Sequence, residues 1–309
     1  MSAVPAATFF DLDAWRSQQL AALELALSGW VTSPGSAPTP AGLNTLSEAM
    51  RYAVLDGGKR LRPLLVLAAC DAVAGNAEAA LRAACAVELI HAYSLVHDDM
   101  PCMDNDVLRR GKPTVHIQFG EAQALLAGDA LQALAFELLT PENSTVPPLM
   151  QARLCRLLAQ AAGCQGMAGG QAIDLASVGL PLTLAELHDM HRLKTGALLQ
   201  ASVMLGAACG TVSVAAQDAL RDFGAAVGLA FQIVDDILDV TGDAATLGKT
   251  AGKDLAQHKP TFVSLMGLPA SMQKAQQLLA QALASLEQSR LENTDALRAL
   301  AGLLVNRLH

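Results

Sequence analysis

The interpretation of this chain begins with the stretch LIHAYSLVHDDMPCMD, residues 89–104, and with a second stretch, FQIVDDILD, residues 231–239. Each runs from apolar residues into a cluster of aspartates: Asp98, Asp99 and Asp104 in the first, Asp235, Asp236 and Asp239 in the second. Adjacent carboxylates repel one another, and burying even one without a partner is costly. We therefore expect both clusters to bind hard cations. Mg²⁺ fits because it takes oxygen ligands and shares its shell with substrate phosphates.

The spacing of the aspartates predicts how each cluster is presented. Asp235 and Asp239 are four residues apart and lie on one face of a helix, where two carboxylates can share a metal ion. Asp98 and Asp104 are six apart, but Pro101 must end the helix between them because it lacks the amide that a helix interior needs. We expect a loop that returns Asp104 towards Asp98. The alternative is a pair of solvated acidic surfaces, which is the weaker interpretation for two clusters at the ends of apolar helices.

Basic segments offer sites for anions. GGKRLRP spans residues 57–63, and Arg109 and Arg110 follow the first aspartate cluster. A guanidinium can donate two parallel hydrogen bonds to phosphate oxygens, although a pair of arginines is more often a solvated surface. The first segment is not a nucleotide P-loop, because the GxxxxGK[ST] spacing is absent. A later polar segment carries Lys249 and Lys259 and would either close over an anion or remain solvated.

The composition predicts an all-α protein with a single domain over residues 1–309. Hydrophobic residues make up 52% of the chain and aromatic residues only 4%, which favours packed helices over a β-sandwich. Apolar residues recur with helical periodicity, and Thr183 and Glu186 form a capping box at a helix start. The expected helices cover residues 43–54, 63–73, 77–100, 121–139, 148–164, 185–209, 215–240, 271–289 and 294–307.

Charge, cysteines and the N-terminal residues limit the class of protein. The formal net charge is −8 and no basic stripe interrupts it, which argues against a nucleic-acid surface. The six cysteines show no CxxC pair, so we expect free thiols in a cytoplasmic protein. Residues 1–10 lack a basic segment followed by a long apolar one, so no signal peptide is expected.

One uncharged stretch, residues 196–217, is long enough to suggest a membrane span. Polar residues interrupt it, and Gly210 with Thr211 has the composition of a helix end. We expect instead a central helix of the bundle, buried on nearly all sides, and no membrane span.

Six motifs follow one another from about residue 43 to the C-terminus. They are GGKRLRP, ELIHAYSLVHDDMPCMDNDVLRRGKPTVH at residues 88–116, GDA at 128–130, GGQAIDL at 169–175, KTG at 194–196, and FQIVDDILD. In content, order and spacing they resemble the all-α trans-isoprenyl diphosphate synthases, and most closely the bacterial farnesyl diphosphate synthases. Val107 departs from the pattern, since many relatives carry another acid there.

The resemblance implies a single helical bundle around a central apolar cavity, and a prenyl transfer reaction. Three Mg²⁺ ions, for which Mn²⁺ could substitute, would bind an allylic diphosphate and let it ionise to an allylic cation. The double bond of isopentenyl diphosphate would attack that cation, and the released diphosphate would remove the proton. The residues implied as catalytic are Asp98, Asp99, Asp104, Lys194 and Asp235. The implied metal ligands are Asp98, Asp104 and Asp235, with Asp99 and Asp239 in support.

The resemblance also implies which residues contact each substrate. Those for isopentenyl diphosphate are Lys59, Arg62, His91 and Arg110. Those for the allylic diphosphate are Arg109, Lys194, Thr195, Gln232 and Lys249, with Lys259 as a weaker candidate. Tyr93, five residues before Asp98, would form the floor of the pocket for the growing tail, whereas Ser94 is too small to do so.

The expected enzyme is therefore a homodimer that condenses isopentenyl diphosphate with dimethylallyl and geranyl diphosphate to give the C15 farnesyl product. A synthase of the C20 geranylgeranyl product is the alternative. A terpene cyclase would replace the second aspartate cluster and would not need Lys59 and Arg62. A non-catalytic partner subunit would lose one cluster, and here both are intact.

Overall fold

The computed structural model describes residues 10–31, 40–55, 57–142, 144–241 and 260–306. These parts of the chain are helical almost throughout, apart from the short antiparallel pair of β1 (Leu108–Arg109) and β2 (Lys112–Pro113). The predicted all-α fold is confirmed. Lys249 and Lys259 lie outside the described residues, and so does most of the polar segment that carries them.

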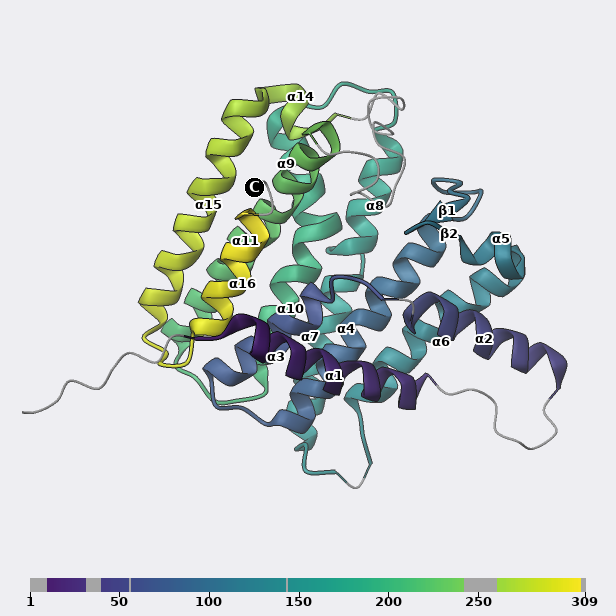
Figure 1. Ribbon diagram of the computed structural model, residues 1–309, viewed down its shortest axis with the longest axis horizontal. Helices are drawn as coiled ribbons and strands as arrows, with labels where there is room; N and C mark the ends of the chain where they lie inside the picture. The colour runs from purple at the N-terminus through teal and green to yellow at the C-terminus, as the bar shows by residue number, and fades with distance from the viewer. Residues whose placement is uncertain (1–9, 32–39, 56, 143, 242–259, 307–309) are drawn as a thin grey trace, which may run out of the picture.

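The helices follow one another along the chain and pack side by side in a bundle (Figure 1). They are α1 (Leu12–Trp30), α2 (Ala41–Leu55), α3 (Leu61–Ala72), α4 (Ala77–Asp98), α5 (Val115–Phe119), α6 (Glu121–Leu139), α7 (Pro148–Ala162), α8 (Met167–Ala176), α9 (Leu184–His191), the π-helical turn η1 (Arg192–Gly196), α10 (Ala197–Ala208), α11 (Val214–Thr241), α14 (Phe262–Met266), α15 (Leu268–Ser289) and α16 (Asp295–Val305).

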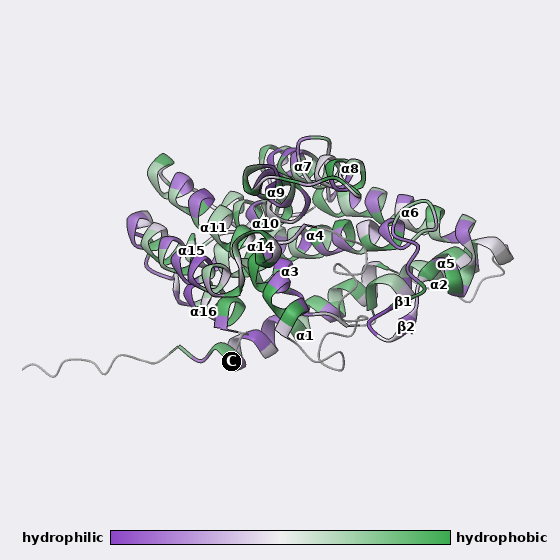
Figure 2. Ribbon diagram, turned by 90° about the horizontal axis from the view of Figure 1, so that it is seen from above, coloured by the Kyte–Doolittle hydropathy of each residue, from purple (hydrophilic) through white to green (hydrophobic). Residues whose placement is uncertain are grey.

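The centre of the bundle is formed by α4 and α10. In the view from above, α11, α15 and α16 lie on one side of this pair and α2, α5 and α6 on the other (Figure 2). One face of α10, with Leu198 and Leu205, packs into the core shared with α4, and another, with Leu199 and Val203, into the core shared with α11. The expectation of a central helix buried on nearly all sides is therefore confirmed, as is the helix end before Thr211.

The structure corrects several helix boundaries. The single helix predicted over residues 185–209 is divided into α9, η1 and α10, and the helix predicted over 148–164 ends at Ala162. Four of the described helices were not predicted at all: α1, α5, α8 and α14. The segment of α8 contains two glycines, which weaken helix propensity, and α1 buries only Leu23 and Leu27, so its apolar stripe is faint in the sequence.

Two of the described helices, α4 and α6, are long and apolar enough to cross a membrane by length and composition alone. In α4, 72% of the most apolar window is buried within the bundle, as for a core helix, and in α6 the share is 39%. The stretch considered in the sequence, residues 196–217, forms instead the 12-residue α10, a break and the start of α11.

Candidate active site

The first aspartate cluster lies where α4 ends. Asp98 is the last helical residue, and the chain then turns back through Pro101. The backbone amide of Asp104 donates to the carbonyl of Asp98 at 2.9 Å, and the amide of Asp106 donates to the carbonyl of Asp99 at 3.1 Å. The predicted loop that returns Asp104 towards Asp98 is confirmed.

Asp99 is held by Arg109. The Nε atom of Arg109 donates to both carboxylate oxygens of Asp99, at 2.9 and 2.8 Å, and Nη2 donates to Oδ1 at 2.5 Å. Asp99 is only 2% exposed, so this pairing compensates a buried charge. The arrangement fixes the guanidinium of Arg109 beside the aspartate cluster and leaves its Nη1 outside the pairing. The role of Asp99 as a supporting metal ligand stays a prediction.

The side chain of Asp98 faces α8 and η1. Gln171 of α8 donates from Nε2 to Oδ1 of Asp98 at 3.3 Å. Burial raises the pKa of Asp98; the charge of Lys194 opposes this shift, and the charge of Asp104 adds to it. Ionising Asp98 therefore costs free energy at this position. A cation bound nearby would offset that cost by favouring the ionised carboxylate.

Lys194 projects from the π-helical turn η1. Its Nζ atom donates to Oδ2 of Asp174 on α8 at 2.6 Å. Burial alone would lower the pKa of Lys194, but Asp98, Asp174 and Asp104 outweigh it and raise the pKa. The pairing of Lys194 with Asp174 depends on a close contact between α8 and η1. A Cβ at Gly170 of α8 would lie only 2.1 Å from the backbone nitrogen of Lys194. Irregular turns of this kind are frequent at functional sites.

The second aspartate cluster lies on α11, and its members have different surroundings. Asp236 is 4% exposed; it accepts from Gln232 Nε2 at 2.8 Å and from the backbone amide of Phe262, at the start of α14, also at 2.8 Å. Asp235 and Asp239 are half-buried and one turn apart on another face of α11, as the spacing predicts. Asp236 thus anchors α14, and the other two remain the candidate ligands.

Hydrogen bonds and ion pairs join the two clusters through η1. Thr195, next to Lys194, donates from Oγ1 to Oε1 of Gln232 at 3.1 Å. A path of polar contacts therefore runs from Asp98 through α8 and η1 to α11, and ends at Asp236 and α14. The structure places Thr195 and Gln232 in this path; their contact with a substrate stays a prediction.

A group of cations forms a second part of the site. Arg110 donates from Nη1 to the carbonyl of Gly57 at 2.6 Å, which brings the two basic segments together. Gly58 has φ +137°, and a Cβ there would lie 2.9 Å from Nη1 of Arg110, so the contact requires glycine. Burial, followed by the charges of Arg62 and Arg110, holds the pKa of His91 well below its ordinary value. Lys59 is exposed and lies in the same loop as Gly57 and Gly58. The four residues predicted to bind isopentenyl diphosphate therefore lie at one end of the bundle.

Tyr93 and Ser94, the residues predicted to set the length of the product, lie on α4 four to five residues before Asp98. Tyr93 is half-buried; it has a side-chain hydrogen bond with Gln132 of α6, and its ring lies edge-on to that of His97 with centroids 5.7 Å apart. Ser94 is buried and donates to the carbonyl of His91 at 2.8 Å. His97 Nε2 lies 3.1 Å from the carbonyl oxygen of Leu125, within hydrogen-bonding distance. His97 is therefore a structural residue, and the role of Tyr93 stays a prediction.

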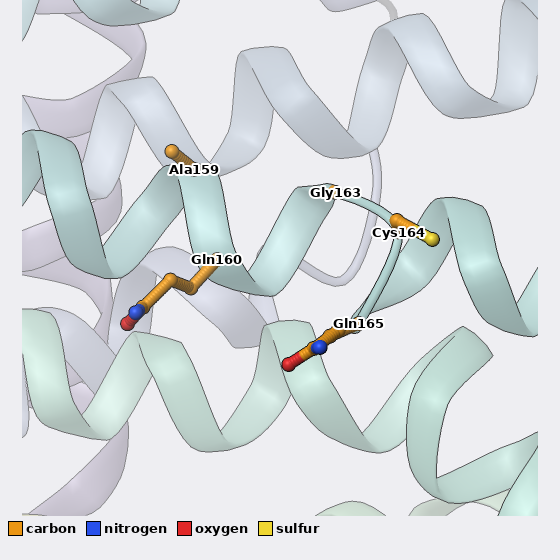
Figure 3. Close-up of a pocket in the computed structure, with 5 residues that line it drawn as sticks. All are labelled: Ala159, Gln160, Gly163, Cys164 and Gln165. Atoms are coloured by element: carbon orange, nitrogen blue, oxygen red, sulfur yellow. The ribbon is translucent and has the colours of Figure 1, made fainter.

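A hollow on the surface at the end of α7 does not belong to this site. It is lined by Ala159, Gln160, Gly163, Cys164 and Gln165 (Figure 3). None of the residues predicted to bind substrate or metal is among them. The predicted site residues lie instead around the C-terminal end of α4.

The donors in the two clusters fit magnesium. In the described parts of the chain, no three His, Cys, Asp or Glu side chains converge closely enough to hold a metal ion by themselves. Mg²⁺ does not require this, because it keeps several waters and is bound through one or two carboxylates and substrate phosphates. The half-buried carboxylates of Asp98 and Asp235 suit such a shell.

Comparison with known proteins decides the family. The model of the polyprenyl synthetase family matches residues 43–300. The chain belongs to this family. A farnesyl diphosphate synthase of Haemophilus influenzae is 49% identical over 266 residues, which cover 85% of this polyprenyl synthetase and 88% of that protein. A chloroplastic geranylgeranyl pyrophosphate synthase of Capsicum annuum is 47% identical over 265 residues, which cover 85% and 72%.

A solved structure gives the same result. A geranyltransferase of Helicobacter pylori, complexed with magnesium and isoprenyl diphosphate, is 33% identical with a TM-score of 0.83, over 98% of this chain and 99% of that one. The family and the enzyme class predicted from the sequence are confirmed: the chain is a prenyltransferase of isoprenoid biosynthesis.

Sequence reasoning missed two features of the site. It did not predict the π-helical turn that carries Lys194 and Thr195, because nothing in a KTG motif distinguishes a π turn from an α turn. It also gave no role to Arg60, which lies within GGKRLRP but turns into the protein and is 4% exposed.

Proposed function

We propose that this polyprenyl synthetase is a farnesyl diphosphate synthase, which joins isopentenyl diphosphate to dimethylallyl diphosphate and then to geranyl diphosphate. The observation that carries the proposal is the position of His91 and Asp98 on α4. Seven residues, or two helical turns, separate them, so they share a face and lie about 10 Å apart along the axis. Arginines gather at the first and carboxylates with Lys194 at the second. Two diphosphates therefore fit side by side on one helix face.

The allylic diphosphate belongs at the acidic end. Its Mg²⁺ ions, three in number and replaceable by Mn²⁺, would be held by Asp98, Asp104 and Asp235 with support from Asp239. They would neutralise the departing diphosphate so that the carbon–oxygen bond ionises.

The side chains of this end act directly on the same diphosphate. Lys194, fixed by Asp174, and Arg109, fixed by Asp99, present their charges to it. Thr195, Gln232 and Lys249 complete its contacts.

Isopentenyl diphosphate belongs at the cationic end, on Lys59, Arg62, His91 and Arg110. Burial, together with the neighbouring arginines, lowers the pKa of His91 and favours its neutral form, whose ring donates a hydrogen bond without adding charge. The bound molecule presents its double bond to the allylic cation, and the released diphosphate takes the proton. No protein base is required. The apolar cavity expected inside the bundle holds the growing tail and excludes water that would trap the cation.

The enzyme works as a cytoplasmic homodimer without a membrane span. Leu125 and Leu126 on α6 and Ile117 on α5 are 48%, 49% and 52% exposed, and these two helices, which pack against each other at the side of the bundle seen in Figure 2, thus offer exposed apolar surface. A second copy covering this surface explains why α6 is apolar and only partly buried. Replacing Leu126 with Glu should convert the dimer to a monomer in size-exclusion chromatography with light scattering.

One experiment tests the reaction and its product. The protein is incubated with Mg²⁺, isopentenyl diphosphate and each allylic primer in turn, and product chain length is measured. Farnesyl diphosphate should be the main product. The relative from Capsicum annuum makes geranylgeranyl diphosphate the second candidate, and a C20 main product would favour it. A correctly folded protein that condenses no primer would contradict both.

A further inference from the structure

Arg60 stands immediately before α3, and its side chain joins three other helices. Nη1 donates to Oε1 of Glu88 on α4, Nε to Oε1 of Glu24 on α1, and Nη2 to the carbonyl of Val54 on α2, each at 2.7 Å. The side chain is only 2% exposed. Burial alone would lower the pKa of Arg60, but the carboxylates of Glu24 and Glu88 outweigh it and raise the pKa. Arg60 is thus a fully engaged, buried cation.

Arg62, two residues further on, is the opposite case. Its Nε atom is buried and has no hydrogen-bond partner among the described residues. Burial lowers the pKa of Arg62, and the charges of Glu88 and Asp235 act against that shift. Glu88 is therefore within electrostatic reach of both arginines but is hydrogen-bonded to only one of them.

We infer that Arg60 is a positioning residue that occupies Glu88 and thereby keeps Arg62 available for the diphosphate of isopentenyl diphosphate. The inference rests on the proposed function, since it concerns the same anion site. It assigns different tasks to two arginines of one motif: Arg60 neutralises the buried carboxylate of Glu88, and Arg62 binds the substrate.

The physical reason is competition for one buried carboxylate. Glu88 is 4% exposed, and a buried carboxylate without a partner is strongly unfavourable. Without Arg60, the cations within electrostatic reach of Glu88 are Arg62, whose Nε still lacks a partner, and Arg110, whose Nη1 already donates to the carbonyl of Gly57. Pairing Glu88 with Arg62 would relieve both deficits and withdraw Arg62 from the anion site.

Glu24 completes the arrangement from outside the region that defines the family. It lies on α1, before the residues matched by the family model, and its side chain is 40% exposed. Its second oxygen, Oε2, accepts from Nη2 of Arg60 at 3.3 Å. The carboxylates of Glu24 and Glu88 together hold the side chain of Arg60 in place. Through Glu24, α1 therefore contributes to the substrate site.

The test compares Arg60→Gln, the double variant Arg60→Gln/Glu88→Gln, and the control Arg82→Gln. Arg82 also pairs with a glutamate, Glu78, but is only half-buried and lies away from the site. The KM values for isopentenyl and geranyl diphosphate are measured, together with the Kd for isopentenyl diphosphate alone, without Mg²⁺ or an allylic substrate. Thermal unfolding of each variant is followed in parallel.

Arg60→Gln should raise the KM and Kd for isopentenyl diphosphate roughly 10- to 100-fold, the equivalent of losing a charged hydrogen bond. The KM for geranyl diphosphate should change far less. The double variant should recover most of the lost affinity, because it removes the carboxylate that would capture Arg62. Arg82→Gln should match the wild type.

Two results would overturn the inference: equal effects on both substrates, or a double variant that binds no better than Arg60→Gln. Either would mean that Arg60 only stabilises the fold. Should Arg60→Gln not fold, Glu88→Gln alone decides: without the competing carboxylate, isopentenyl diphosphate should bind at least as tightly as to the wild type, and a weakening would contradict the competition. A wild-type protein that binds isopentenyl diphosphate yet condenses no primer would contradict the proposed function and leave the binding comparison intact.

Discussion

Lys194 and Asp174 form an ion pair of 2.6 Å that fastens the π-helical turn η1 to α8. Gln171, one turn earlier on α8, holds Asp98, and Thr195, next to Lys194, holds α11 through Gln232. The two aspartate clusters are therefore not independent. The turn between them sets their relative position, and a change in the turn should be felt at both.

The contact between Gly170 and the backbone of Lys194 should tolerate no side chain. In Gly170→Ala the new Cβ would lie 2.1 Å from the Lys194 nitrogen and 2.4 Å from its Cα, both backbone atoms that cannot turn away. We expect a loss of about 1–3 kcal/mol in the free energy of unfolding and a fall in kcat. Chemical denaturation and steady-state kinetics would measure these effects.

Gly29 provides the matched control, because it lies in α1 with nothing within 4 Å of its Cβ position. Gly29→Ala should stabilise the protein by about 0.5–1 kcal/mol and leave turnover unchanged. If the two variants behaved alike, close packing around η1 would not explain the loss.

Asp98 and Asp235 should be required for turnover but not for folding. Replacing either with Ala should lower kcat by orders of magnitude, and excess EDTA should do the same to the wild type. Because burial of the ionised Asp98 is costly, its removal should leave the Tm unchanged or raise it. Asp222→Ala, an exposed position on the same helix as Asp235, is the control. Full activity in EDTA would rule out the metal assignment.

Arg62 and Arg109 should separate the two substrates. Arg62→Ala should mainly raise the KM for isopentenyl diphosphate and Arg109→Ala the KM for the allylic substrate, each by about 1.5–3 kcal/mol in binding. Arg109→Ala should also lower the Tm, since it leaves Asp99 buried without its partner. Arg221→Ala, on the surface of α11, should change neither KM. Equal effects of both variants on both substrates would contradict the division.

Several features could be predicted because they depend on local rules. Pro101 ends α4 through a local backbone effect that does not depend on tertiary contacts. The four-residue spacing of Asp235 and Asp239 likewise places them on one face of any helix. The roles of the arginines could not be predicted in the same way. Arg60 and Arg62 stand in one motif, and what distinguishes them is an ion pair with Glu88, 28 residues away in the chain. That is tertiary information.

The same limit applies to neighbouring aspartates. Asp98 and Asp99 are adjacent and chemically identical, yet one accepts from Gln171 and the other is paired with Arg109. The direction of each side chain follows from the last turn of α4 and from the return of the chain at β1. The spacing alone indicates that the cluster binds cations. It does not indicate which carboxylate is already paired with a cationic side chain of the protein.

His191 should make the protein sensitive to acid. Its ring is packed against Phe262, and neither ring nitrogen has a hydrogen-bond partner among the described residues. Burial lowers its pKa to about 4, against about 6.5 in the unfolded chain. Above pH 6.5 both states are neutral and stability is constant. Between pH 6.5 and 4 only the unfolded state takes up the proton, so stability falls by about 3 kcal/mol in total.

His191→Phe should remove most of this loss in urea titrations between pH 7 and 4, because phenylalanine keeps the ring contact and cannot be protonated. His188→Gln, at a half-buried neighbouring position whose charge contributes less than burial to the lowered pKa of His191, should leave most of the pH dependence as it is. A His191→Phe variant as acid-sensitive as the wild type would show that other groups cause the loss.

Tyr93 should limit the length of the product. It lies five residues before Asp98 on α4, about 7.5 Å along the axis from the allylic diphosphate site. Its ring meets the edge of His97, so the side chain is fixed rather than free to move aside for a longer tail. Tyr93→Ala should therefore shift the product from C15 towards C20 or longer, measured by chromatography of the dephosphorylated products. Tyr52→Ala is the control, since Tyr52 lies on α2 and bonds the carbonyl of Pro113. A Tyr93→Ala enzyme that is active yet still stops at C15 would place the limit elsewhere.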